Sequence, residues 1–132
     1  MRPAVPDDLP MLRAIRDRAG ADALSDPALV TDELLDRLIA AEAVTVWDDG
    51  AIAGFAAVDG ATIHLLVDAT RRHRGIGRDL LASASDAVRA AGHPAAALCL
   101  SADSSAARHY RAAGWMEAGR APTGGRILKR PS

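Results

Sequence analysis

The chain has 132 residues and a formal net charge of −1, with 49% hydrophobic and 25% charged residues. This suits one ordinary globular domain over residues 1–132, and no stretch approaches the ~18–20 apolar residues of a membrane span. The single cysteine, Cys99, excludes an internal disulfide, and the N-terminus lacks the apolar stretch of a signal peptide. We therefore expect a cytosolic protein with no membrane segment.

Two helices are predicted within the first forty residues. Asp7 or Asp8 can cap the first, residues 7–20, and Pro10 fits its first turn. A loop over 21–29 precedes Thr31, which can cap the second helix. The predicted buried positions are Leu9, Leu12 and Ile15 in the first helix and Leu34, Leu35, Leu38 and Ile39 in the second.

Three short apolar runs follow, at residues 43–47, 51–58 and 61–67. Asp-Gly pairs at 49–50 and 59–60 separate them, and an Asp-Gly pair between such runs is a strong hairpin signal. The pattern predicts a three-stranded antiparallel meander.

The second half of the chain predicts two more helices and three more strands. A helix after residue 75 is expected to end at Gly92 and Pro94, and a buried strand over 95–100 should run parallel to 61–67, because a helix separates the two. A helix over 106–113 and a hairpin around 123–125 complete the chain. The apolar residues that recur at helical spacing after residue 75 are Ile76, Leu80, Leu81, Ala84, Ala87, Val88 and Ala91.

The stretch "RRHRGIGRDLL" (71–81) forms a glycine turn that leads into a helix. Such a turn exposes backbone N–H groups without intrahelical partners, and the helix dipole favours an anion there. Gly75 and Gly77 allow a phosphate to come close, while flanking arginines add positive charge. The turn therefore predicts a site for a phosphate-rich ligand, with Arg71, Arg72, Arg74 and Arg78 as its charged side chains.

Three kinds of phosphate-binding turn can be compared with this stretch. The P-loop pattern is absent, and the dinucleotide pattern fails because Leu80 stands at its third glycine. The pattern R/Q-x-x-G-x-G/A for acetyl-coenzyme A matches residues 72–77. Here the sequence resembles the GCN5-related N-acetyltransferase (GNAT) family, with Ala69 in place of the usual proline and His73 where glycine is frequent.

A second motif strengthens this resemblance. The stretch "DSSAARHYRAAGW" (103–115) is similar to the family's N-x-x-A-x-x-x-Y-x-x-x-G-F, with Tyr110 at the position of the general acid. Asp103 replaces the family asparagine, and an ionised aspartate can only accept hydrogen bonds. The resemblance covers essentially the whole chain. It implies a single GNAT-like α/β domain with a mixed, mostly antiparallel sheet, splayed parallel central strands at 61–67 and 95–100, and about four helices.

The resemblance also implies where acetyl-CoA, the expected cosubstrate, is bound. Backbone groups of Leu65, Leu66 and Val67 would hold the pantetheine arm, and an N–H there can serve as the oxyanion donor. N–H groups of residues 73–78 would take the pyrophosphate, and Tyr110 would protonate the departing thiolate. The further residues expected at the cofactor site are Arg72, His73, Arg74, Gly75, Ile76, Gly77, Arg78, Asp103 and Ala106.

The general base is less well defined by the sequence. Ala61 and Ile63 stand where the family often has a glutamate, and His64 is the nearest titratable group on that strand. By simple alternation His64 faces away from Ala61 and Ile63, unless a β-bulge turns it round. Asp103 and His109 are weaker candidates. The acids that could instead attract a cationic acceptor are Asp22, Asp26 and Asp32.

The leading prediction is an acetyl-CoA-dependent N-acetyltransferase that acts on a primary amine of a small molecule or peptide, without a metal, as a monomer or homodimer. A catalytically idle acyl-CoA-binding module is the alternative. Residues 71–132 carry eleven bases against four acids, whereas residues 1–70 are acidic. This asymmetry predicts two differently charged surfaces, or merely mixed ones, but no nucleic-acid reader motif accompanies it.

Overall fold

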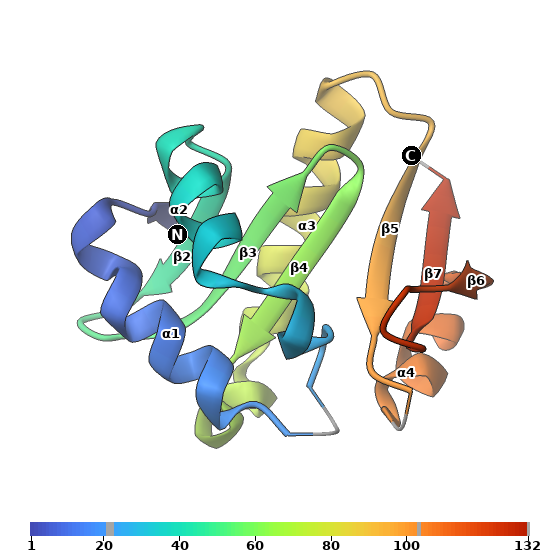
Figure 1. The fold of residues 1–132 in the computed structure, drawn as a ribbon, viewed down its shortest axis with the longest axis horizontal. Coiled ribbons are helices and arrows are strands. Elements are labelled where there is room, and N and C mark those ends of the chain that lie inside the picture. Colours follow the sequence, from blue (N-terminus) through green and yellow to red (C-terminus); the bar gives the residue numbers. More distant parts are fainter. Residues whose placement is uncertain (21–22, 103, 132) are drawn as a thin grey trace.

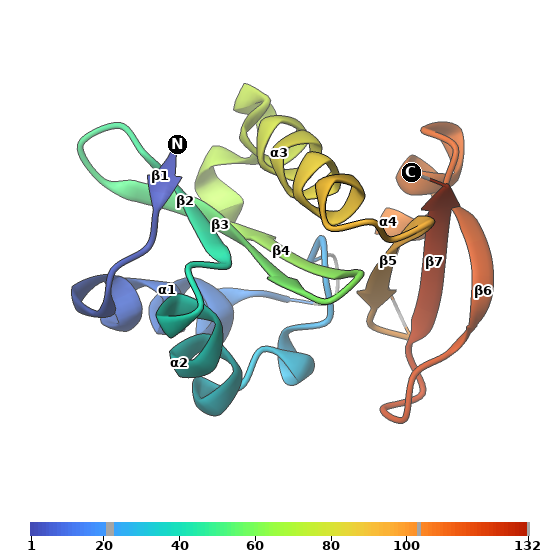
Figure 2. The same ribbon diagram turned by 90° about the horizontal axis from the view of Figure 1, so that it is seen from above.

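The computed structural model describes residues 1–20, 23–102 and 104–131, and for residues 72–74 the backbone alone. Within these ranges one seven-stranded sheet has the order β1-β2-β3-β4-β5-β7-β6. Helices α1 and α2 cover one face of the sheet and α3 the other (Figures 1 and 2). The elements are β1 (Arg2–Pro3), η1 (Pro6–Asp8), α1 (Leu9–Arg18), η2 (Pro27–Leu29), α2 (Asp32–Ala40), β2 (Val44–Asp48), β3 (Ile52–Asp59), β4 (Thr62–Val67), η3 (Ala69–Arg74), α3 (Ile76–Ala90), β5 (Ala95–Leu100), α4 (Ala106–Ala112), β6 (Met116–Arg120) and β7 (Arg126–Pro131), where η marks a 3₁₀ helix.

The two N-terminal helices form where the sequence predicts them, with one correction. Thr31 caps α2, because its Oγ1 accepts a hydrogen bond from the Leu34 N–H at 3.1 Å. Asp8 precedes α1, but its carboxylate accepts from the Val5 N–H and from Arg2, each at 2.8 Å. The predicted side-chain cap on α1 is therefore wrong, and Asp8 instead ties the start of the chain to η1.

The antiparallel meander of β2, β3 and β4 is confirmed. Both predicted turns depend on glycine, since Gly50 has φ +111° and Gly60 has φ +61°. The pairing of β3 with β4 continues without a bulge from the pair Asp59–Thr62 to the pair Gly54–Val67. Side chains on β4 consequently alternate regularly between the two faces of the sheet.

The two central strands are parallel and splayed, as predicted. β4 and β5 are in register at two pairs, Thr62 with Ala97 and Ile63 with Leu98. Beyond these pairs the strands diverge, and Figure 1 shows the separation widening toward the end of each strand. Strand β5 then pairs with β7 in antiparallel orientation along its whole length.

The apolar core lies in two clusters, one on each side of the sheet. The α3 side contains Leu65, Leu80 and Tyr110, and the α1–α2 side contains Leu12, Leu35 and Leu66. Along α3 the buried residues are Ile76, Leu80, Ala84 and Val88. Ala87 and Ala91 are exposed, so their predicted place on the buried stripe is wrong. None of the described helices is long and apolar enough to cross a membrane.

Candidate active site

The glycine turn lies between η3 and α3. Gly75 has φ +75°, in the left-handed region that glycine enters readily, and α3 begins at the next residue, Ile76. The first N–H groups of an α-helix lack intrahelical partners and carry the positive end of its dipole. The backbone of residues 75–78 therefore provides N–H groups that can bind an anion, while the Ile76 side chain is buried in the core.

Both glycines of the turn lie so close to a neighbouring side chain that an added Cβ would crowd it. A Cβ added at Gly77 would lie 3.0 Å from Leu24 Cδ1, and one added at Gly75 would lie 2.9 Å from the Arg78 guanidinium. Arg78 therefore folds back over the turn, although its side chain is 81% exposed. The backbone of residues 72–74 continues η3, whereas the side chains of Arg72, His73 and Arg74 lie outside the described part of the chain.

A cavity of about 400 Å³ connects this turn to the central strands. Its volume lies in the range of small-molecule sites, roughly 300–1,000 Å³. Trp115 is a buried residue on its wall, and within the described part of the chain its indole Nε1 has no hydrogen-bond partner. The residues that line the cavity are Leu24, Leu65, Gly75, Gly77, Arg78, Leu81, Ala82, His109, Tyr110, Ala113, Trp115 and Arg130.

Tyr110 lies on α4 at the edge of this cavity and is 2% exposed. Its hydroxyl donates a hydrogen bond to the Leu24 carbonyl at 3.0 Å. The ring packs edge-on against Trp115, with 6.1 Å between the ring centroids. Trp115 also contacts Arg130, whose guanidinium carbon lies 5.1 Å from the centroid of the Trp115 ring. The tyrosine is thus held rigidly, with its hydroxyl directed at the segment that precedes η2.

The end of β4 presents its backbone groups to two different neighbours. The Leu65 N–H faces the splayed side and donates to Ser25 Oγ at 2.8 Å. By alternation Val67 offers its backbone to the same side, and Leu66 offers its backbone to β3. Of the three residues expected to hold the pantetheine arm, Leu65 alone lines the cavity, while the Leu66 side chain packs in the core on the α1–α2 side.

His64 lies on the other side of the sheet from Tyr110. His64 pairs with Ala57, which belongs to the apolar cluster on the α1–α2 side. The pairing of β3 with β4 has no bulge, so the His64 ring stays on the face that regular alternation predicts. The side chain is 5% exposed, and its Nδ1 has no hydrogen-bond partner among the residues that the structure describes. Burial lowers the pKa of His64 below its usual 6.5, with Asp59 opposing the shift. The imidazole is therefore neutral at pH 7.

Three acids are predicted to attract a cationic acceptor. The structure describes two of them, and these two differ in their partners. Asp32 binds Arg16 at 2.6 Å, and this hydrogen bond lowers the pKa of its carboxyl. Asp26 is 6% exposed and accepts from the Ala28 N–H and the Thr123 hydroxyl, with no cationic side chain bridged to it among the described residues. Asp22 lies outside the described residues.

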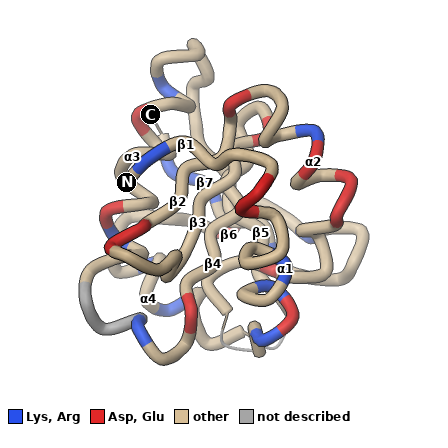
Figure 3. The backbone as a smooth tube through the Cα atoms, turned by 90° about the vertical axis from the view of Figure 1, so that its left-hand side faces the viewer, with Lys and Arg blue, Asp and Glu red and all other residues tan. Residues whose placement is uncertain are grey.

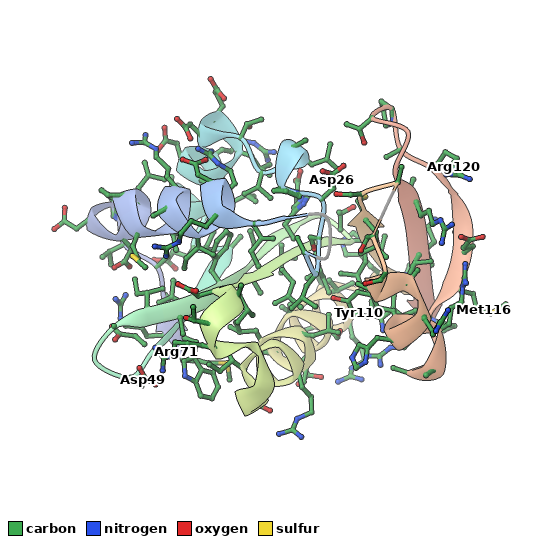
Figure 4. All side chains as sticks on the ribbon, turned by 90° about the horizontal axis from the view of Figure 1, so that it is seen from below. Asp26, Asp49, Arg71, Tyr110, Met116 and Arg120 are labelled. Carbon is green, nitrogen blue, oxygen red and sulfur yellow. The ribbon has the colours of Figure 1, made fainter. Side chains whose placement is uncertain are left out.

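The remaining predicted residues are placed as follows. Arg71 forms an ion pair with Asp49 of the β2–β3 hairpin, so its charge is already matched (Figure 4). The N–H of Ala106, the first residue of α4, donates to Ser104 Oγ at 3.1 Å. Asp103 lies outside the described residues, and His109 is an exposed residue at the cavity rim.

Sequence reasoning missed Leu24, Ser25 and Arg130, which the structure brings to the cavity or to the splayed strands. Leu24 and Ser25 belong to the segment 21–29, for which the sequence predicts only a loop. No periodic pattern indicates a contact between residues 25 and 65, because the contact depends on how α1 and α2 dock on the sheet. Arg130 lies in the predicted last hairpin, but its place at the cavity depends on the pairing of β7 with β5, which no local pattern indicates.

Comparison with known proteins identifies the family of this fold. The acetyltransferase (GNAT) domain profile matches residues 18–125, so the chain belongs to the GNAT family. This range contains the glycine turn, both splayed strands and Tyr110. No curated protein matches the chain.

Solved structures share the fold at low sequence identity. A ribosomal-protein-alanine N-acetyltransferase from Brucella melitensis has a TM-score of 0.75 at 21% identity, over 99% of this chain and 98% of that one. The PaiA N-acetyltransferase from Thermoplasma acidophilum, in complex with coenzyme A, gives 0.70 at 14% identity, over 99% and 97% of the two chains. N-acetylglutamate synthase from Neisseria gonorrhoeae has a TM-score of 0.72 at 18% identity, and the match covers 98% of this chain but 34% of that one. At these identities the likeness establishes the fold.

Proposed function

We propose that the protein transfers the acetyl group of acetyl-CoA to a primary amine. The observation that carries the proposal is the cavity that joins an anion-binding glycine turn to Leu65 and Tyr110. The cavity places the N–H groups of the turn and the end of β4 in one space, which supports binding of a ligand that carries both phosphate and a reactive carbonyl. Acetyl-CoA supplies the acetyl group in activated form, as a thioester.

The residues along this cavity fit the parts of that substrate. N–H groups of residues 75–78 and the Arg78 guanidinium suit a pyrophosphate. An N–H of β4 suits the carbonyl oxygen, since a fixed donor stabilises charge that develops there without reorganisation. The Tyr110 hydroxyl is the acid that can give a proton to the departing thiolate.

The acceptor is proposed to reach the thioester from the α1–α2 side. Asp26 lies on that side of the splayed strands and Tyr110 on the other, as Figure 4 shows. A buried carboxylate without a cationic partner is costly, and an ammonium group would supply that partner. We assign Asp26 to acceptor binding, and His64, as a neutral imidazole on the same side, to proton acceptance.

The proposal is tested by titrating the protein with acetyl-CoA and then measuring thiol release over a panel of primary amines. Binding followed by amine-dependent release of free thiol is the expected result. Binding without release for any amine would favour the alternative, an idle acyl-CoA-binding module. Absence of binding would contradict both.

A further inference from the structure

Residues 23–26, here called the strap, cross the space between the splayed strands. The Leu65 N–H of β4 donates to Ser25 Oγ at 2.8 Å, and the Asp26 N–H donates to the Cys99 carbonyl of β5 at 2.7 Å. These two groups face each other across the region in which β4 and β5 no longer pair. The strap thus supplies the hydrogen bonds that the strands cannot give each other there.

The strap also contacts the two groups that the proposed reaction requires. Leu24 accepts the hydrogen bond of the Tyr110 hydroxyl at 3.0 Å, and its side chain lines the cavity. Ser25 is fully buried, and its Oγ occupies the position of an oxygen acceptor at Leu65. One short segment therefore engages the donor for the carbonyl oxygen and the acid for the thiolate at once.

Other bonds hold the strap at both ends. The Ala23 carbonyl accepts from Ser104 Oγ at 3.5 Å, and the Asp26 carboxylate accepts from Thr123 Oγ1 at 3.1 Å. The Leu24 side chain also lies where a Cβ on Gly77 would come within 3.0 Å, beside the phosphate-binding turn. Through Leu24 the strap forms part of the cavity wall, together with Leu65 and Tyr110.

We propose that the strap is an autoinhibitory contact: acetyl-CoA must release its bonds to Leu65 and Cys99 in order to bind productively, while the Asp26 carboxylate keeps its bonds to Ala28 and Thr123. The inference rests on the proposed function, because the thioester carbonyl and Ser25 Oγ compete for the same N–H. A buried backbone N–H without a partner is costly, so Ser25 stabilises the free protein. When no thioester is bound, the strap keeps both the Leu65 N–H and the Tyr110 hydroxyl hydrogen-bonded.

The test compares Ser25→Ala with wild type and with the matched control Ser83→Ala, which lies on α3 outside the strap. Without Oγ, Leu65 lacks its partner only in the free protein, so acetyl-CoA should bind about three- to tenfold more tightly to Ser25→Ala by calorimetry. The control should bind as wild type does. Equal or weaker binding by Ser25→Ala, with wild type binding, would overturn the strap alone. Failure of all three proteins to bind would overturn the proposed function as well.

A measurement on the wild-type protein covers the case in which Ser25→Ala does not fold. Amide hydrogen exchange, resolved by NMR, reports the Asp26 N–H that is bonded to Cys99. Saturation with acetyl-CoA should accelerate exchange at Asp26 at least threefold while Leu65 remains protected. Unchanged or slower exchange at Asp26 in the saturated protein would show that the strap stays in place and would overturn the inference.

Discussion

At the scale of single residues, Tyr110 decides between an enzyme and a binding module. Tyr110→Phe keeps the ring that packs on Trp115 and removes the hydroxyl that contacts Leu24. If this hydroxyl protonates the thiolate, single-turnover acetyl transfer at saturating acetyl-CoA should slow by about 10²–10⁴-fold. Affinity for acetyl-CoA should not weaken. Rates within threefold of wild type would remove Tyr110 from the mechanism.

Asp26 is the residue whose charge is expected to select the acceptor. Asp26→Asn can still accept from the Ala28 N–H and can meet the Thr123 hydroxyl, so the substitution removes charge with little loss of structure. We expect kcat/KM for a cationic alkylamine to fall about tenfold or more, mainly through KM. Transfer to hydroxylamine, uncharged at neutral pH, should change little. An equal loss for both acceptors would identify Asp26 as merely structural.

His64 should make stability depend on pH. Its folded-state pKa lies below the unfolded value of 6.5, so between these values the unfolded chain binds more protons than the folded one. Above pH 6.5 the ring is neutral in both states, so its burial in neutral form does not lower the free energy of unfolding. As the pH falls below 6.5, the free energy of unfolding decreases. Melting temperatures from pH 5 to 8 should decline toward acid in wild type and decline less in His64→Leu. Parallel curves would contradict a buried, neutral His64.

At the scale of elements, the glycine turn can be tested without straining the backbone. Gly75 has positive φ, so substitution there would combine strain with steric blockage, whereas Gly77 has an ordinary helical conformation. Gly77→Ala adds a methyl group toward the flexible end of Leu24, at the wall of the cavity. Because Gly77 lines the cavity beside the first N–H groups of α3, the added methyl group narrows the space for a phosphate there, and we expect acetyl-CoA affinity to fall about tenfold, ~1.4 kcal/mol, with the fold intact.

The control for this substitution is Ala87→Val, at an exposed position of the same helix. It should leave acetyl-CoA affinity unchanged. If calorimetry shows the same affinity for Gly77→Ala and for wild type, the phosphate groups are bound elsewhere.

The elements that the sequence predicts well are those fixed by local chemistry. Asp-Gly turns, the Thr31 cap and the four buried positions of α3 each depend on neighbours within a few residues. Asp8 failed as a cap because Arg2 and the Val5 N–H compete for its carboxylate. The strap could not be predicted, since its bonds to Leu65 and Tyr110 span 40 and 86 residues.

At the scale of the whole molecule, most aspartates of residues 43–70 are paired within the acidic half of the sequence, since Arg2, Arg18 and Arg37 belong to residues 1–70 and Arg71 alone comes from the basic half. The four aspartates of residues 43–70 are each paired with an arginine, and Figure 3 shows acidic and basic positions intermixed on the side with α1 and α2. These pairs are Asp48 with Arg2, Asp49 with Arg71, Asp59 with Arg37 and Asp68 with Arg18. The prediction of mixed surfaces describes this part of the molecule better.

Positive charge nevertheless remains around the cavity, which leads to a prediction about ionic strength. Arg78 and Arg130 line the cavity. Arg78 is largely exposed, and its one acidic contact among the described residues is a weak one, to Asp79 at 3.3 Å. Affinity for coenzyme A should fall several-fold as salt rises from about 0.01 M to 1 M, because the Debye length shrinks from about 30 Å to about 3 Å.

A comparison of coenzyme A with the compound that lacks its 3′-phosphate separates the effect of charge on affinity from the effect of ligand shape. At low salt the dephosphorylated compound should bind about two- to fivefold more weakly, the value of one exposed ion pair. The difference should vanish at 1 M salt, because screening removes the attraction that the extra phosphate adds. Calorimetric titrations of both compounds at two salt concentrations give this comparison. Equal affinities at low salt, or a difference that persists at high salt, would show that the arginines do not act through long-range attraction.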